Sequence, residues 1–406
     1  MEHFIPVDKA QVLAQLLADP AWKKGEAAAF RELFELLEHF FHNEAYRLNR
    51  ELKNRYAPID PDRDLRDLSG QAGRTAKVDP AGFRRSLDQV LKGGNYRVVG
   101  AAELDAAFAA SDLVGLKLSI DLEDYDELLI AVRGHRTVTE TVGRLFFLKK
   151  EIAVELHERV LLYARWKPAD YFAAKKRRGL PFVPGTGNLK LFKDVPKNDL
   201  ETILPNAVPR MNLLDKILLF GPGIGGGIPI LTAKVVPAVL GLALAWKSGE
   251  ALRGHKLYQG MMEGLLALGV LFGYLFRQYN GYVAKKIKFA KMLTESLYFK
   301  ALGNNAGVFH ALLDAAEDEE QKETILAYAF LLRAERPLTM KELDGRIEAW
   351  FAARGVNLDF EVDDALAKLA RLGLGKKRGG KWTVLPLEKA KRRVDWLWDN
   401  LFTFNR

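Results

Sequence analysis

Hydrophobic and polar positions repeat along the chain with different periods in different regions. Between residues 25 and 56 apolar residues recur every three or four positions, which predicts an amphipathic helix; they are Phe30, Leu33, Phe34, Leu37, Phe40 and Phe41. A second helix is predicted over residues 79–90, with Asp79 as N-cap and Pro80 at the first helical position. Residues 1–110 are therefore expected to form a helical N-terminal region.

Between residues 116 and 166 the pattern changes to one typical of β-strands. The segments LKLSID, ELLIAVRGHRTVTET, RLFFLKKEIAVEL and ERVLLYARW are rich in β-branched and aromatic residues, with turn residues between them. They predict a small antiparallel sheet. A connector rich in Pro, Gly and Asn follows and contains one short apolar run, LKLFKDV. Sheet and connector together are expected to occupy residues 111–210.

From about residue 212 to residue 276, apolar residues and glycines dominate. Residues 228–246 are interrupted only by Lys234, and residues 257–276 only by Glu263. Each stretch is close to the ~20 residues that cross the ~30 Å hydrocarbon core of a bilayer. The sequence therefore predicts a two-helix membrane hairpin within residues 211–282. The alternative is a pair of helices buried in a soluble core.

The interior of this hairpin contains both charges and glycines. Aligning the two spans leaves Lys234 and Glu263 offset by roughly 10 Å along the helix axis, so we expect these membrane-facing charges to extend toward opposite interfaces instead of pairing. Small residues spaced by four allow a second helix to approach closely and predict a protein partner or a homo-oligomer; they are Gly260, Gly264, Gly269 and Gly273. The glycine-rich segment 221–227 precedes the first span, which indicates a re-entrant or interfacial turn and not a dinucleotide loop.

The basic residues after the second span predict its orientation. Lys285, Lys286 and Lys288 follow it with no acidic residue among them, and the more basic flank belongs on the cytoplasmic side. Two spans then place both soluble parts on that side. We expect a multi-pass protein of the bacterial inner membrane, or of a mitochondrial or plastid membrane, with the lipid bilayer as partner. The first residues lack the features of a signal peptide.

The region 283–406 combines further helices with a hairpin. Basic and acidic helices are predicted over residues 283–302 and 307–332. Helices at residues 320–332, 340–354 and 361–371, followed by a hairpin, suggest a winged-helix-like domain. The hairpin carries Lys376, Lys377, Arg378 and Lys381, which we expect to contact an anionic surface. The third helix has a net charge of −1, which disfavours nucleic acid. The predicted fold class is α+β, mainly α.

Composition excludes several classes of protein. The 406 residues include no cysteine, 28% are charged and the formal net charge is +9. A disulfide-stabilised secreted module, a cysteine-ligated zinc finger and an Fe–S protein are therefore excluded. Signatures of zinc proteases, serine hydrolases and P-loop enzymes are lacking, so the sequence identifies no catalytic residue and predicts no cofactor.

Two helical stripes have the residue types of a metal site. Asp314, Glu317 and Glu320 are weak metal-ligand candidates, and Glu38, His39 and His42 form a second set. The favoured interpretation of the first stripe is simpler. Its acidic run, AEDEEQKE, borders apolar positions at helical spacing and is expected to be the water-facing side of the helix.

Several strings together resemble one family along nearly the whole chain. They are HFIPV, YAPIDPDRD, LKLFKDVPKNDLETILP, LYFKALGNNAGVFHALLDAAEDEEQKETILAYAFLL and the closing pattern DDALAKLARLGL…WTVLPLEKA. They are similar to the domain-of-unknown-function 3754 family (DUF3754, transmembrane protein 143-like). The resemblance implies a membrane hairpin between soluble halves and provides no catalytic residues. Asn304, Asn305 and the acidic string match the family's most recognisable motif.

Together these observations favour a non-enzymatic, membrane-tethered adaptor or regulatory protein. One alternative is a membrane-bound, metal-dependent enzyme that uses the acidic helix at residues 314–323. A second is a membrane-tethered nucleic-acid binder that acts through the winged helix.

Overall fold

The computed structural model describes residues 3–20, 22–23, 25–63, 79–110, 116–144, 148–177, 179–211 and 297–402, together with scattered positions between 236 and 287. Two compact units are distinguished. The first consists of Met1–Leu104, Leu122–Lys197 and Lys300–Arg406, and the second of Asp105–Asp121 and Asn198–Phe299. The described chain is mainly helical α+β, as its pattern predicts.

The predicted membrane hairpin falls largely outside this description. Within the described part of the chain, no helix has both the length and the apolar composition needed to cross a bilayer. The glycine-rich segment 221–227 lies outside the described residues, and so do the two predicted spans except at scattered positions. Lys234 and Glu263 are also outside, so their predicted placement stays a prediction.

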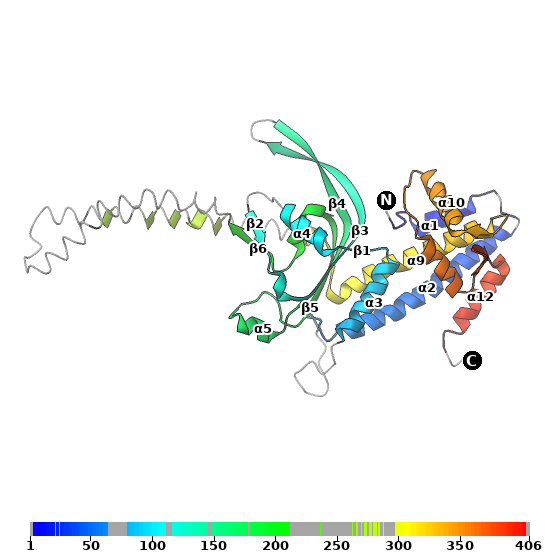
Figure 1. The fold of residues 1–406 in the computed structure, drawn as a ribbon, viewed down its shortest axis with the longest axis horizontal. Helices are drawn as coiled ribbons and strands as arrows, with labels where there is room; N and C mark the ends of the chain where they lie inside the picture. Colours follow the sequence, from blue (N-terminus) through cyan, green and yellow to red (C-terminus); the bar gives the residue numbers. More distant parts are fainter. Residues whose placement is uncertain are drawn as a thin grey trace, which may run out of the picture. The chain divides into compact units, whose positions relative to one another are not determined.

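The first unit contains a five-stranded antiparallel sheet in the order β1-β3-β4-β5-β7 (Figure 1). Its strands are β1 (Arg97–Val98), β3 (Tyr125–Arg144), β4 (Leu148–Trp166), β5 (Gly187–Pro196) and β7 (Ala301–Asn304). Val160 of β4 faces Val132 of β3 on one side and Phe192 of β5 on the other. The outer strand β7 comes from the far side of the apolar block, so the sheet joins distant parts of the sequence.

Four helices accompany this sheet, α1 (Lys9–Leu17), α2 (Glu26–Tyr56), α3 (Pro80–Gly93) and α9 (Val308–Leu332). In α3 the predicted cap is confirmed, because the Asp79 carboxylate accepts a hydrogen bond from the amide of Gly82 at 2.9 Å and Pro80 occupies the first turn. Helices α2, α3 and α9 lie side by side next to the sheet (Figure 1). Alternate residues of β3, β4 and β5 pack against them because successive side chains of a strand point to opposite faces.

The C-terminal part adds helices and a second, small sheet. Helix α10 (Met340–Ala352) begins with a capping box between Thr339 and Glu342. Helix α11 (Val362–Arg371) follows, and α12 (Leu387–Asp399) closes the described chain. Three strands form the sheet β8-β10-β9; they are β8 (Leu338–Thr339), β9 (Gly375–Arg378) and β10 (Lys381–Val384).

Two separate hydrophobic cores divide the first unit. One core contains the N-terminal half of α2, the C-terminal half of α9 and residues of α1, α10, α11 and α12. The other contains the C-terminal end of α2, the N-terminal half of α9, α3 and one face of the large sheet. Both long helices therefore run from one core into the other, and their middle turns lie where the two cores separate.

The smaller elements complete the description. Helix α4 (Ala101–Ala110) and helix α5 (Ala169–Ala174) are short, and β2 (Leu116–Ser119) pairs with β6 (Val208–Met211) in a two-stranded sheet of the second unit. The strand pattern predicted near residue 116 is thus present but lies outside the main sheet. The run LKLFKDV, expected in a connector, is the strand β5 of the main sheet. A helix predicted to residue 302 is wrong at its end, where β7 pairs with β5.

Candidate functional site

Charged side chains are buried in the middle of α9, between the two cores. Glu319, Lys322 and Glu323 expose only 2%, 3% and 1% of their surface. The expectation that this acidic run faces water is therefore wrong for these residues. Burying a charge is costly unless it is paired and hydrogen-bonded, so their partners define the site.

Lys322 and Glu319 hold the N-terminal segment, residues 3–7, against α9. The Lys322 ammonium lies 2.7 Å from the Glu319 carboxylate and donates to the carbonyls of Ile5 at 2.8 Å and Val7 at 3.3 Å. The second carboxylate oxygen of Glu319 accepts a hydrogen bond from the Ile5 amide at 2.9 Å. The HFIPV string is thus bound through its backbone to two buried charges.

Lys368 of α11 is the centre of the neighbouring charge cluster. Its ammonium lies 2.5 Å from Glu323, 2.8 Å from Asp364 and 3.1 Å from Glu320, so each of its three protons faces a carboxylate. The other carboxylate oxygen of Glu323 accepts a hydrogen bond at 2.7 Å from Asn95, whose amide also donates to the carbonyl of His3. The cluster therefore joins α9, α11, the turn after α3 and the N-terminal segment.

Burial and charge act in opposite directions on the pKa values of this cluster. Burial raises the pKa of Glu323 to about 7, although Lys368 and Asn95 favour its ionised form. Burial likewise raises the pKa of Glu320. Burial alone would lower the pKa of Lys368, but its three carboxylate neighbours outweigh that effect and raise it. Lys368 is therefore a charged, structural lysine and does not serve as a neutral base.

A second polar cluster surrounds Asn305, one of the two asparagines of the recognisable motif. Its side-chain oxygen lies 2.9 Å from the Tyr56 hydroxyl and accepts a hydrogen bond from the Leu189 amide at 3.1 Å. Its amide nitrogen donates to Asp62. Asn305 has a positive φ of 47°, a left-handed conformation that asparagine tolerates better than most residues. The string that begins at Tyr56 and the string that contains Asn305 therefore meet at strand β5.

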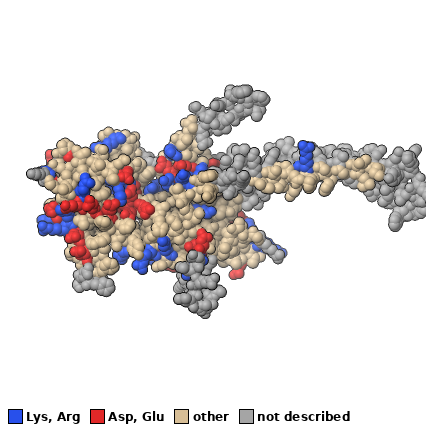
Figure 2. All heavy atoms as spheres, turned by 180° about the vertical axis from the view of Figure 1, so that it is seen from behind, with Lys and Arg blue, Asp and Glu red and all other residues tan. Residues whose placement is uncertain are grey.

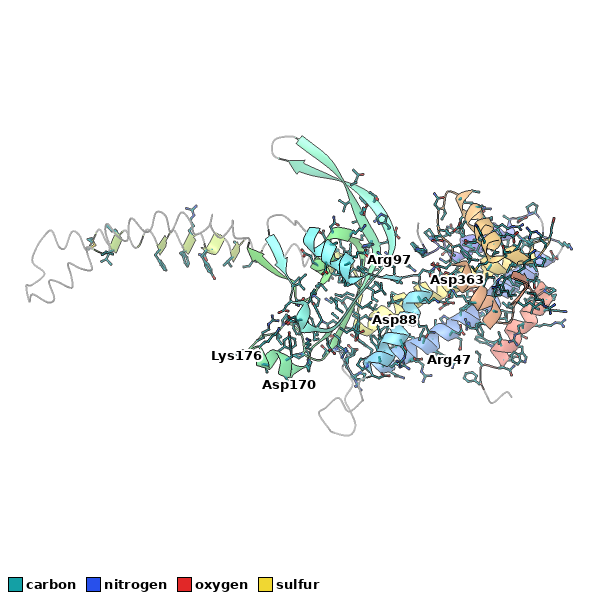
Figure 3. All side chains as sticks on the ribbon, viewed as in Figure 1. Arg47, Asp88, Arg97, Asp170, Lys176 and Asp363 are labelled. Atoms are coloured by element: carbon teal, nitrogen blue, oxygen red, sulfur yellow. The ribbon has the colours of Figure 1, made fainter. Side chains whose placement is uncertain are left out.

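A groove opens at the level of the Lys368 cluster, where the two cores separate. It has a volume of about 510 Å³ and is lined by α2, α3, α9 and α11. Its apolar lining includes Leu48, Val90 and Leu313, and its charged lining includes Glu317, Glu320 and Arg371. A bidentate ion pair between Arg371 and Glu44 connects α11 to α2 across it. Figure 3 labels Arg47 on α2 and Asp88 on α3, the helices on two sides of this groove.

The predicted metal-ligand candidates, all of which the structure describes, do not come together as one site. Some are exposed, and most contact other side chains. Asp314 is exposed, Glu317 lies 3.1 Å from His42, and Glu320 pairs with Lys368. On α2, Glu38 pairs with Lys9, and the His39 ring lies 6.3 Å from that of Trp398. Among the residues that the structure describes, no three His, Asp or Glu side chains gather as a metal site would require.

The predicted surface contacts divide into two groups. Lys376, Lys377, Arg378 and Lys381 are exposed on the β9–β10 hairpin, whereas Lys285, Lys286 and Lys288 lie outside the described residues. Of the glycines predicted at a helix–helix contact, Gly269 and Gly273 are described, and among the described residues no atom outside their own helix backbone lies within 4 Å of where a side chain would begin. Gly260 and Gly264 lie outside the described positions.

Sequence reasoning missed Lys322, Lys368 and Asn95 as parts of the site. One local signal was available on α9, because Glu319, Glu320 and Glu323 continue the spacing of three and four set by Leu312 and Ala316. Charges on a continuing apolar stripe indicate buried ion pairs. Their partners carry no comparable signal, since Lys368 lies 45 positions from Glu323 along the chain.

The fold and the site define a mainly helical α+β protein whose central helix carries a buried layer of ion pairs. Residues 157–307 match the family described as Protein of unknown function (DUF3754). The resemblance drawn from the motifs is thus confirmed over this range. The matched range begins in β4 and includes Asn305, whereas the buried charges of α9 follow it. No solved structure matches the chain.

Proposed function

We propose that the chain is a two-span integral membrane protein that acts as a membrane-tethered adaptor or regulatory protein, with its soluble parts on the cytoplasmic side. One observation supports the proposed membrane tether. Described helical positions in the second apolar stretch expose large apolar side chains, with exposed fractions of 61% at Leu265, 72% at Phe272 and 58% at Phe276. Large apolar side chains exposed at such positions favour an apolar partner, and lipid supplies one.

The adaptor role rests on the C-terminal part, which we interpret as winged-helix-like. In this interpretation α11 is the third helix, which in a DNA-binding protein would enter the major groove. Here α11 buries Ala365, Leu366 and Leu369 in the core and commits Lys368 to carboxylates. This burial supports a role in protein contacts over a role in reading nucleic acid.

The β9–β10 hairpin supports a contact with an anionic bilayer surface. Its four basic residues are exposed, and Gly379 and Gly380 turn it tightly with positive φ values. Acidic and basic residues are otherwise interspersed on the face drawn in Figure 2. A purely basic hairpin on such a mixed surface favours attraction to anionic headgroups. The four-residue spacing of Gly269 and Gly273 supports, as part of the same proposal, self-association within the bilayer.

Carbonate extraction tests the tether. Wild-type protein is expected to stay in the membrane pellet, and Phe272→Arg is expected to shift protein to the supernatant because an arginine replaces a lipid-facing ring. Tyr46→Arg is the control, since Tyr46 is an aromatic on α2 that is also exposed, at 56%. Release of the wild-type protein by carbonate would contradict the proposal.

Trypsin cleavage of the full chain reconstituted in vesicles tests the hairpin. Cleavage at residues 376–381 should be slower in vesicles of phosphatidylcholine and phosphatidylglycerol than in phosphatidylcholine alone, and high salt should remove the difference. Cleavage after Lys341, in α10, provides the reference. Equal rates in both vesicles would contradict a contact with anionic lipid. Affinity purification in mild detergent then identifies the partner of the adaptor.

A further inference from the structure

We infer that the groove between α2, α3, α9 and α11 is a docking site for a basic segment of a partner protein, with one lysine or arginine side chain inserted into it. The groove holds about 510 Å³ and has an apolar centre. Charged residues from α2, α9 and α11 surround that centre. An apolar centre with a polar rim is the usual anatomy of a protein interface.

The charge of the groove is opposite to that of the whole chain. Five carboxylate residues and three basic residues line it, which gives a formal charge of −2. The chain as a whole carries +9. A basic peptide is therefore repelled by the protein as a whole and attracted only locally, so its binding would report on this groove.

Glu320 supplies a free acceptor at the inner wall. Its Oε2 atom pairs with Lys368 at 3.1 Å, whereas Oε1 has no hydrogen-bond partner among the described residues. Burial raises the pKa of this carboxyl group, although Lys368 favours its charged form. An incoming ammonium or guanidinium group would add a second cationic partner at Oε1. Glu317 lies one turn earlier on α9, 3.1 Å from an exposed histidine, His42.

The apolar part of the groove suits the aliphatic portion of a lysine or arginine side chain. Leu48 and Ala45 are partly buried beside the groove, and Val90 and Leu313 form its deeper surface. Long basic side chains commonly lay their methylene groups along apolar surface while the charged end finds acceptors. The groove offers both kinds of surface, apolar side chains and carboxylates, within one lining.

A peptide segment fits this groove better than a small free amine. The lining comes from four helices, and its rim carries Arg47 and Arg371 as well as the carboxylates. A small amine uses only the acidic inner wall. A segment with a basic residue flanked by apolar and acidic residues also pairs with the basic positions of the rim. The inference does not depend on the membrane tether.

Binding of a labelled synthetic peptide to the full chain in detergent tests the inference. The probe is a short helical peptide of leucine, alanine and lysine, and its counterpart has glutamate in place of lysine. Fluorescence anisotropy is expected to show binding of the lysine peptide only. Ala367→Trp and Glu317→Gln should each weaken it about tenfold. Ala367 is exposed at the groove and belongs to no ion pair, so this variant fills the groove without disturbing the fold.

Matched controls separate the groove from general electrostatics. Ala353→Trp and Glu335→Gln place the same changes at exposed positions outside the groove and should leave binding unchanged. Three results would each overturn the inference. The wild-type chain could fail to bind the peptide, or the control variants could lose as much binding as the groove variants. The third is full displacement of the peptide by spermine at the same amine concentration. The last result would assign the groove to small amines.

Discussion

The ammonium of Lys368 lies 2.5 Å from the carboxylate of Glu323, and both side chains are almost completely buried between the two hydrophobic cores. One partner comes from α11 and the other from α9, so this pair fixes the C-terminal part of the chain to the central helix. A buried pair of this kind is costly to break, because the remaining charge stays in a poorly solvating environment. We expect the Lys368–Glu323 pair to favour one packing arrangement of α11 against α9 over others.

Removing the lysine should therefore destabilise the protein strongly. We expect Lys368→Met to lower the free energy of unfolding by about 3–5 kcal/mol, since three carboxylates lose their common partner. Adding Glu323→Gln to that variant should recover part of the loss, with a coupling energy of about 0.5–3 kcal/mol. Urea denaturation of the four proteins in mild detergent measures this cycle. Strictly additive effects would show that the pair does not interact.

The raised pKa of Glu323 predicts the direction in which the free energy of unfolding changes with pH. Between its ordinary value of 4.5 and its folded value of about 7, the folded state holds a proton that the unfolded state has released. The contribution of this group to stability is thus complete below about pH 4.5 and is lost as the pH rises toward 7. Urea unfolding at pH 5 and pH 7.5 should show a smaller pH dependence in Glu323→Gln than in the wild type. An unchanged difference between the two pH values would contradict this assignment.

The elements that sequence alone could predict are those with a local signal. Helix α3 has its cap and proline at Asp79 and Pro80, and α10 has its capping box at Thr339. Strand β5 has no such signal, because turn-forming residues precede it and its burial comes from pairing with β4. Strand β7 follows directly on a helical pattern, so the sequence gives no sign that a strand begins there. Both strands form because they pair with distant strands, and local periodicity carries no information about those partners.

The site was harder to predict for the same reason. The run from Glu317 to Glu323 is acidic enough that composition indicates water exposure, and only its helical spacing indicates burial. Several partners of these side chains are distant in sequence, since the Ile5 amide lies 314 positions from Glu319 and Lys368 lies 45 positions from Glu323. Tertiary contacts, which the motifs do not contain, determine the partners of each string.

The contact between Lys322 and the N-terminal segment predicts a local change. We expect Lys322→Met to cost about 3–5 kcal/mol, because Glu319 and the carbonyls of Ile5 and Val7 lose a buried donor. Hydrogen exchange should increase at residues 3–7 and in the middle of α9 before other regions of the first unit. Lys389→Met, at an exposed position of α12, is the control. Uniform acceleration across the first unit would indicate global destabilisation and contradict a local role.

Asn305 allows its backbone and side-chain roles to be separated by two substitutions. Both Asn305→Ala and Asn305→Gly remove the contacts with Tyr56, Leu189 and Asp62. Only alanine also retains a Cβ atom in the left-handed conformation, which costs about 1–2 kcal/mol for most residues. We therefore expect both variants to have a lower free energy of unfolding, with the loss in the glycine variant smaller than in the alanine variant by about 1 kcal/mol in urea denaturation. If glycine is as destabilising as alanine or more so, the positive φ contributes nothing and the side-chain contacts account for the whole effect.

Tyr56→Phe removes one hydroxyl from the same cluster. It should lower the free energy of unfolding less than either variant, because the Leu189 and Asp62 hydrogen bonds remain.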